Sequence, residues 1–179
     1  MKIVLIASII SLFFAQANYQ ILSTPSNFNN IFESEDFYHN YHYSAFSAFY
    51  PNDINLFAFT TSVKKNPHSE IFITIKNLNY GELNDSENNY IFGANESLIQ
   101  FSFLKRIKHK ITNTVALNIN YLKSKIDTYQ SDLIGLDLLT LFKFRNNHSI
   151  SISFKNYGKI ITSYSSTKIE LPKTISLSY

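Results

Sequence analysis

The sequence contains no cysteine among its 179 residues, which excludes both a disulfide framework and a thiolate metal site. Tryptophan is also absent, and the chain has only four glycines and four prolines. The glycines are scattered and form no phosphate-binding loop. The stability of the fold must therefore come from backbone pairing and side-chain packing alone.

Motifs of catalysis and metal binding are missing as well. No Gly-x-Ser-x-Gly elbow is present, and no two carboxylates show a pairing that suggests acid–base chemistry. The segment "YHNYHY" places His39 and His42 three residues apart, which puts them on opposite faces of a strand. A metal ion needs three or four converging ligands. We therefore expect no enzyme activity, no metal and no cofactor.

Charge gives no sign of a nucleic-acid partner. Sixteen Lys and Arg residues against thirteen Asp and Glu residues leave a net charge of +3. The basic residues are spread along the chain apart from "KRIKHK" at 105–110, which is typical of a turn between strands. A scattered balance of this kind lacks the basic patch of a nucleic-acid-binding domain.

The first seventeen residues have the features of an export signal. Lys2 is followed by an apolar run over 3–14 and by Ala15-Gln16-Ala17, a small-x-small cleavage site. Cleavage before Asn18 leaves 179 minus 17, or 162 residues, outside the cytoplasm. We predict a signal peptide at 1–17, an irregular segment at 18–40 and one β-barrel domain at 41–179.

Alternation of apolar and polar residues dominates the rest of the chain. No run of 18 apolar residues occurs, so no transmembrane helix is expected. In "NHSISISFKN" (147–156), for example, Ile150, Ile152 and Phe154 share one face of an extended chain. Similar patterns predict about eight antiparallel strands, at 41–50, 54–63, 69–80, 96–105, 110–124, 132–145, 147–156 and 171–179, with a further short one near 160–166.

Two architectures fit such strands. A soluble sandwich buries the apolar row, whereas a transmembrane barrel turns it toward lipid and fills its interior with polar residues. Roughly 9 to 14 residues per strand matches what a tilted strand needs to cross a bilayer. The polar rows are mostly Ser, Thr, Asn and Gln, and aromatic residues near strand ends suit interface girdles: Tyr80, Tyr121, Phe142, Phe144 and Tyr179. We predict an all-β, antiparallel transmembrane β-barrel in the cell outer membrane.

Two polar segments are predicted to be the long loops of this barrel, at 81–93 and 123–132. Asp137 lies in mid-strand opposite an apolar row, so it is expected inside the barrel, in a structural pair with a Lys or Arg such as Lys143 or Lys155. Glycine in mid-strand, at Gly135, indicates a bulge or a close approach of two backbones.

A series of glycine, aromatic and small polar residues follows a recognisable order from residue 78 onward. The series comprises Tyr80, Gly81, Gly93, Asn118, Ser124, Tyr129, Ser131, Gly135, Asp137, Asn156, Gly158, Leu171 and Pro172. In this order the chain resembles the PorQ/PorV family, FadL-like outer-membrane barrels of the type IX secretion system, and the PorQ branch most of all. It departs from the family in lacking the glycine-rich N-terminal region, and family members continue for many strands after the Leu-Pro pair.

The resemblance implies a scaffold without enzyme activity that anchors a surface component of the type IX secretion and attachment machinery. Its partners would be outer-membrane lipid and a PorZ-like surface protein held by the loops at 81–93 and 123–132. A small outer-membrane channel or lipophile-transport barrel, and a soluble exported β-domain, are the alternatives. The fold would be a complete short barrel, closed by pairing of 171–179 with 41–50, or part of a larger FadL-like barrel with open edges.

Overall fold

The computed structural model describes residues 20–22, 43–50, 53–85, 89–107, 112–144, 148–164, 171 and 173–179. The predicted signal peptide, His39, His42 and Pro172 lie outside the described residues, as does most of the segment 18–40. Within the described part, no helix is long and apolar enough to cross a membrane.

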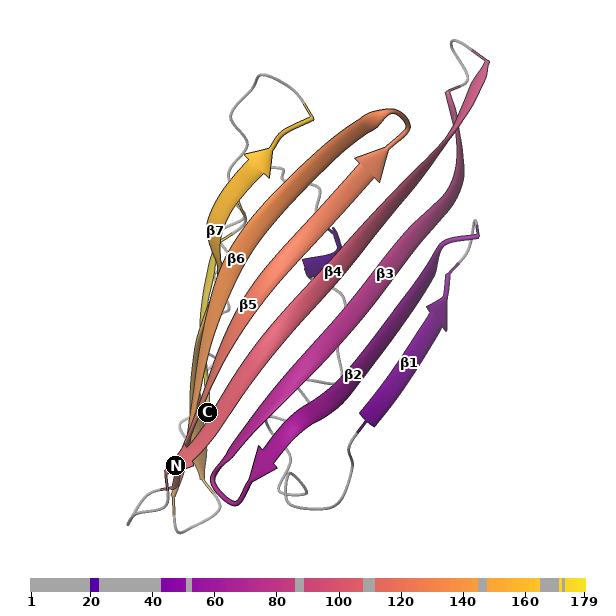
Figure 1. Ribbon diagram of the computed structural model, residues 1–179. Helices are drawn as coiled ribbons and strands as arrows, with labels where there is room; N and C mark the ends of the chain where they lie inside the picture. The colour runs from indigo at the N-terminus through magenta and orange to yellow at the C-terminus, as the bar shows by residue number, and fades with distance from the viewer. Residues whose placement is uncertain are drawn as a thin grey trace, which may run out of the picture.

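The described part of the protein is all-β, as predicted, with a single short 3-10 turn, η1. The elements in chain order are η1 (Gln20–Leu22), β1 (Tyr43–Phe49), β2 (Asn55–Asn66), β3 (Ser69–Asp85), β4 (Tyr90–Ile107), β5 (Thr112–Ile126), β6 (Tyr129–Lys143), β7 (Ser149–Thr162) and β8 (Thr174–Ser178). Each strand pairs antiparallel with the next, which gives one eight-stranded meander in the order β1 to β8 (Figure 1).

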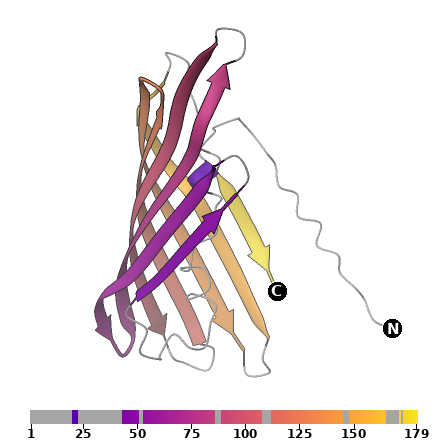
Figure 2. The same cartoon turned by 90° about the vertical axis from the view of Figure 1, so that its right-hand side faces the viewer.

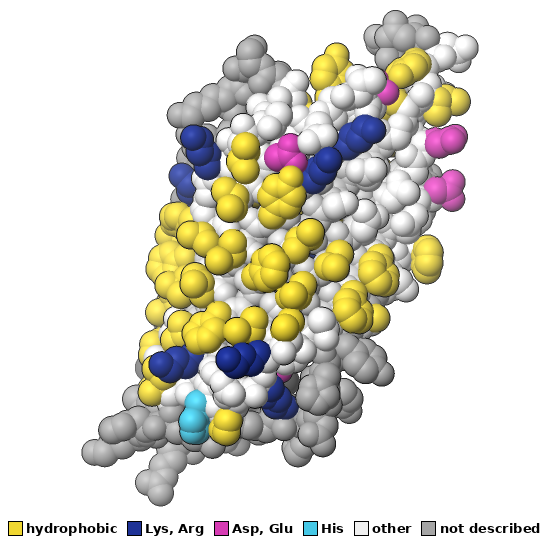
Figure 3. Space-filling view, viewed as in Figure 1, with side chains coloured by type: hydrophobic (Ala, Val, Ile, Leu, Met, Phe, Trp, Pro, Cys, Tyr) yellow, Lys and Arg dark blue, Asp and Glu magenta, His cyan; other side chains and the backbone are white. Residues whose placement is uncertain are grey.

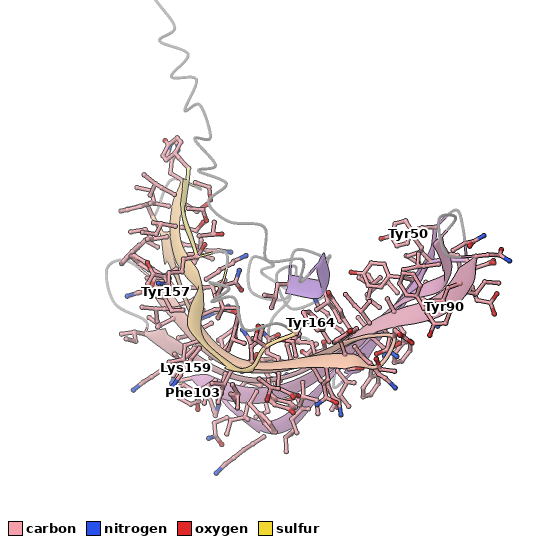
Figure 4. All side chains as sticks on the ribbon, turned by 90° about the horizontal axis from the view of Figure 1, so that it is seen from above. Tyr50, Tyr90, Phe103, Tyr157, Lys159 and Tyr164 are labelled. Atoms are coloured by element: carbon pink, nitrogen blue, oxygen red, sulfur yellow. The ribbon has the colours of Figure 1, made fainter. Side chains whose placement is uncertain are left out.

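The sheet curves strongly but does not close. Its strand order ends at β1 on one side and at β8 on the other, and these two strands do not pair with each other in the described residues. Figures 2 and 4 show a trough with β1 and β8 at its two rims. The architecture is therefore barrel-like, and the pairing of 171–179 with 41–50 that would close a short barrel is not formed.

Both segments predicted to be long loops are largely strand. β3 continues to Asp85 and β4 begins at Tyr90, so the hairpin includes most of 81–93. β5 and β6 are joined by a two-residue turn in which Asp127 has a φ of 54°, a backbone conformation that Asp tolerates better than most residues. These predictions were wrong because the strands outlast their apolar rows, so the alternation fades before the pairing ends.

The separate short strand predicted near 160–166 begins within β7, which ends at Thr162, and residues 165 and 166 lie outside the described residues. An irregularity in the β6–β7 pairing lies at Asn156, whose φ is 62°. Before it, Phe154 is on the convex face, and after it Tyr157 is the next exposed residue. One inserted residue changes the parity of the alternation, so a single strand reads as two in the sequence.

Two apolar clusters cover the concave side of the sheet, which we call the trough. The leucine layer comprises Leu56, Leu78, Leu98, Leu122 and Leu133, one from each of β2 to β6, and it packs against Ile21 and Leu171. The second cluster, nearer the other end, comprises Phe72, Leu104, Ala116, Leu139 and Leu141. η1 therefore lies inside the trough, where Figure 4 shows it between the two arms of the sheet.

Candidate functional site

The convex face of the sheet carries large exposed apolar side chains in a continuous band, which we call the apolar belt. Its exposed members are Phe57, Ile71, Ile75, Ile99, Phe101, Phe103, Leu117, Ile119, Tyr121, Ile134, Leu136, Leu138, Phe154, Tyr157, Ile175 and Leu177. Figure 3 shows the band crossing the sheet, with polar surface beyond it. The belt is far larger than the apolar patches that water-exposed proteins tolerate.

Strand register makes the belt continuous across seven strands. Phe103 pairs with Leu117, which pairs with Leu138. Leu138 in turn pairs with Phe154, and Phe154 with Ile175 on β8. Because paired residues share a face of the sheet, these apolar residues form one row. Parallel rows above and below it complete the belt.

Polar and charged residues mark the margins of the belt. Along β5, apolar side chains give way to Asn113 at one end and to Lys123 at the other. The ten residue steps between them span roughly 34 Å of strand, or about 25 Å across a bilayer at a typical strand tilt. Lys and Arg side chains follow both edges of the belt in Figure 3. This height matches the hydrocarbon-facing band of outer-membrane barrels.

Tyr121 fits the predicted aromatic girdle, whereas Tyr80 does not. Tyr121 lies at the belt margin, and its hydroxyl donates a hydrogen bond of 2.8 Å to Asp132. Tyr80 shares the inward row of Leu78 and packs against the leucine layer in the trough. A girdle position for Tyr80 is therefore wrong, because an even residue of β3 faces inward.

Polar side chains line the trough between its two apolar clusters. This buried polar layer comprises Thr60, Thr74, Gln100, Ser102, Asn118, Asn120 and Asp137. The hydroxyls of Thr60 and Thr74 are 2.9 Å apart across β2 and β3. The inward row therefore contains a band of residues that a conventional protein core would exclude, because buried polar groups are costly unless they are hydrogen-bonded.

Asp137 is the centre of the polar layer. Its carboxylate accepts hydrogen bonds from the side-chain amides of Asn118 (3.4 Å) and Asn120 (2.8 Å) and from the backbone N–H of Asn156 (2.8 Å). The last bond fixes the irregular residue of β7 against β6. The predicted inward position is confirmed, and these three donors all belong to asparagines. The pairing with a lysine stays a prediction.

Gly135 and Gly158 form a close backbone contact beside this carboxylate. They are register partners on β6 and β7. A Cβ atom at Gly158 would lie 2.6 Å from the Cα of Gly135, closer than real Cβ contacts allow. The close approach predicted at Gly135 is therefore present. The residue that must be glycine for this approach is Gly158. Together with Asp137 and Asn156, this contact fastens β7 to β6.

Gly81 and Gly93 lie close together in the β3–β4 hairpin, where the register partner of Gly93 is Glu82. Gly81 has a φ of 72°, and its N–H donates a 3.0 Å hydrogen bond to the side chain of Asn79. The pairing register shifts here, between Asn79 and Glu82. Gly93 accepts a 2.9 Å hydrogen bond through its carbonyl from the N–H of Asp127. The two glycines thus sit at a bulge where the β5–β6 hairpin is joined to β4.

This pair of hairpins extends beyond the belt. Figure 1 shows the β3–β4 hairpin rising past its neighbours. Near its tip the Tyr90 hydroxyl donates a 3.0 Å hydrogen bond to Asp127, and the Tyr90 ring stacks on Phe92. The hydrogen bond raises the pKa of the Tyr90 phenol. Ile91 beside it is 59% exposed. The tip therefore presents a braced, partly apolar surface outside the belt.

At the leucine layer, the trough is occupied by Ile21 of η1. The N–H of Ile21 donates a 2.7 Å hydrogen bond to the buried carboxylate of Glu96, and the Ser124 hydroxyl lies 3.5 Å from the other oxygen. Ile21 is fully buried. The sequence gives no local signal for the contact of Ile21 with Glu96, because neither residue belongs to a motif.

The remaining residues of the resemblance have structural positions too. Ser131 is buried and donates a 2.7 Å hydrogen bond to the carbonyl of Thr162. Leu171 is buried in the leucine layer, while Tyr129 is exposed at the start of β6. Among the described residues, no group of three or more His, Asp or Glu side chains is placed to hold a metal ion.

Comparison of the chain with family models, with curated proteins and with solved structures finds no match. What the geometry defines is an antiparallel β-sheet with an apolar exterior and a layered, partly polar interior.

Proposed function

We propose that the protein is an outer-membrane protein whose apolar belt contacts lipid. One observation carries this proposal: the exposed row is apolar while the buried row is partly polar. On β4, Phe101 is 51% exposed, whereas its neighbours Gln100 and Ser102 are 7% and 1% exposed. A soluble sandwich has the opposite arrangement, because exposing an apolar row to water is unfavourable.

Extraction experiments test this proposal. An outer-membrane sheet protein should remain in the envelope fraction after a carbonate wash, and its mobility in a detergent gel should change on boiling. The alternative, a soluble exported β-domain, predicts release of the protein by carbonate and one mobility before and after boiling. That result would refute the membrane proposal.

We further propose that the protein is a scaffold of type IX secretion, which holds a surface protein of the PorZ kind. The support is the resemblance in sequence, some of whose residues lie close together across strands: Gly81 near Gly93 at one bulge, and Asp137 hydrogen-bonded to Asn156 at the other. In this proposal the projecting β3–β4 and β5–β6 hairpins contact the partner, in place of the loops expected there. The exposed tip residue Ile91 is the most accessible anchor.

A pair of variants on one strand separates partner contact from assembly. Ile91→Asp changes the hairpin tip, and Ile107→Asp makes the same change at the other end of β4, where the side chain is also exposed. In a deletion strain, wild-type protein and Ile107→Asp should restore the surface display of type IX cargo. Ile91→Asp should reduce it about tenfold, as loss of an apolar anchor at an interface centre typically does.

Two outcomes contradict the scaffold proposal. One is normal display of cargo in the deletion strain. The other is full activity of Ile91→Asp at wild-type levels in the outer membrane.

The alternative function, a channel or lipophile transporter, has less support. The leucine layer offers an apolar lining, but Ile21 and Leu171 of the chain itself pack against it. A transported lipophile would have to displace both residues, together with the hydrogen bond between Ile21 and Glu96.

A further inference from the structure

The two rim strands differ from every other strand in charge. Each of β2 to β7 contains at least two charged residues, whereas β1 (YSAFSAF) and β8 (TISLS) contain none. Neither rim strand contains proline. Water-exposed edge strands are usually protected against pairing by charge, by proline or by bulges. The composition of β1 and β8 instead suits strands that pair on both sides.

The contents of the trough favour a barrel wider than one that β1 and β8 of a single chain would close. A closed barrel of eight strands has an interior just wide enough for side chains. Here the interior also holds main chain, because η1 lies in the trough with the N–H of Ile21 bonded to Glu96. Tyr164 lies on the same concave side, opposite Phe103 on the convex side (Figure 4). The sheet therefore has the curvature of a wider barrel with more than eight strands.

We propose that a second copy of this chain pairs with both rims, so that two chains form one barrel with two identical seams, each between β8 of one copy and β1 of the other. This proposal rests on the proposed membrane location. Parity supports it: with an even number of strands, β1 and β8 run in opposite directions, so joining β8 to β1 of another copy continues the antiparallel meander.

Membrane orientation selects this seam over the other symmetric possibilities. Two copies inserted in the same direction are related by an axis along the membrane normal, which makes β1 parallel to β1 of its partner. Only the β8-to-β1 seam is antiparallel for copies of equal orientation. It also joins outward rows, Ala45 and Ser47 on β1 with Ile175 and Leu177 on β8, so the apolar belt continues around the barrel.

In lipid, both rims of the sheet need a neighbouring strand. Every N–H and C=O in the hydrocarbon region must find a partner within protein, so membrane sheets close completely. Among the described residues, β8 has a strand neighbour only on its β7 side and β1 only on its β2 side. Pairing of β8 with β1 in both seams gives each rim a second strand neighbour.

Engineered cysteines test the seam cleanly because the chain contains no cysteine of its own. A full-length chain carrying Ser47→Cys and one tag is co-expressed with a full-length chain carrying Leu177→Cys and a second tag. Oxidation of the envelope should then give a disulfide-linked product with both tags. Ala45→Cys and Ile175→Cys complete a panel of four pairings that covers the possible registers.

The matched control replaces Leu177→Cys with Ile119→Cys, which faces outward from the centre of the sheet between β4 and β6. The best rim pairing should give about tenfold more two-tag product than this control, because disulfides form only between closely placed Cβ atoms. A single chain with both Ser47→Cys and Leu177→Cys reports on self-closure. If it gives a fast-migrating monomer instead of a dimer, the two-chain barrel is refuted.

Membrane insertion is scored separately from cross-linking. A chain that resists carbonate but yields no two-tag product in any pairing refutes the two-chain barrel and leaves the membrane proposal standing. A chain released by carbonate refutes the membrane proposal itself, whatever its disulfides. A two-tag product from carbonate-resistant envelopes supports both.

Discussion

The two faces of the same strands are built on different principles. On the convex face of β4 to β6, side chains such as Phe101, Ile119 and Leu136 are exposed and need only be apolar. On the concave face, Asp137, Gly158 and Ile21 each have a specific partner at a specific distance. The comparison teaches that the outer face is specified by residue class, whereas the trough is specified residue by residue.

The close contact in the trough should be the most sensitive point. Gly158→Ala places a methyl group against the backbone of β6, so we expect loss of more than about 3 kcal/mol of unfolding free energy, beyond ordinary overpacking. The control, Gly93→Ala, makes the same change where the nearest atom to the new Cβ is 4.0 Å away. Urea unfolding of refolded protein in detergent measures both. Equal stability of the two variants would show that the glycine contact is dispensable.

Loss of the Asp137 carboxylate should have the next largest effect on stability. Asp137→Ala leaves two buried amides and the N–H of Asn156 without their acceptor, which should destabilise the protein by about 3 kcal/mol. Glu82→Ala removes an exposed carboxylate from β3 and should change stability by less than about 0.5 kcal/mol. The same urea titration reports both. A tolerated Asp137→Ala would remove the argument that this residue fastens β7.

A single charge on the outer face should have the smallest of these effects on stability. The direction of its effect distinguishes a membrane protein from a soluble one. Ile119→Lys places a charge in the middle row of the belt, which costs roughly 2 kcal/mol against lipid. Asn95→Lys, on the same face beyond the belt, should cost less than about 1 kcal/mol. Refolding into lipid vesicles measures both. If the protein were soluble, Ile119→Lys would be neutral or would improve solubility.

Much of the fold follows from alternation, and the failures have identifiable causes. Strand number and the outward direction of the apolar rows could be predicted because the belt imposes period two on β2 to β7. Beyond the belt the outward row becomes polar, as at Asn95, so the outer ends of the two hairpins, at 81–93 and 123–132, looked like loops. The bulge at Asn156 reversed the alternation and split β7 in two.

The interior was harder to predict than the exterior. The positions of Gly135 and Asp137 could be anticipated because glycine and a carboxylate are unusual in mid-strand. The partners of these two residues could not be predicted, because they lie on neighbouring strands and the sequence does not define the register between strands. The openness of the sheet likewise depends on long-range curvature, and no residue pattern in β1 or β8 reveals it in isolation.

The hydrogen bond between Ile21 and Glu96 joins residues 75 positions apart, and this separation fixes an order of events. Ile21 leaves the ribosome before any strand, yet its binding place consists of one leucine from each of five successive strands. Loop closure over such a distance comes late in folding. The segment around Ile21 is thus synthesised first but docks last, because it can bind only after β2 to β6 have paired in register.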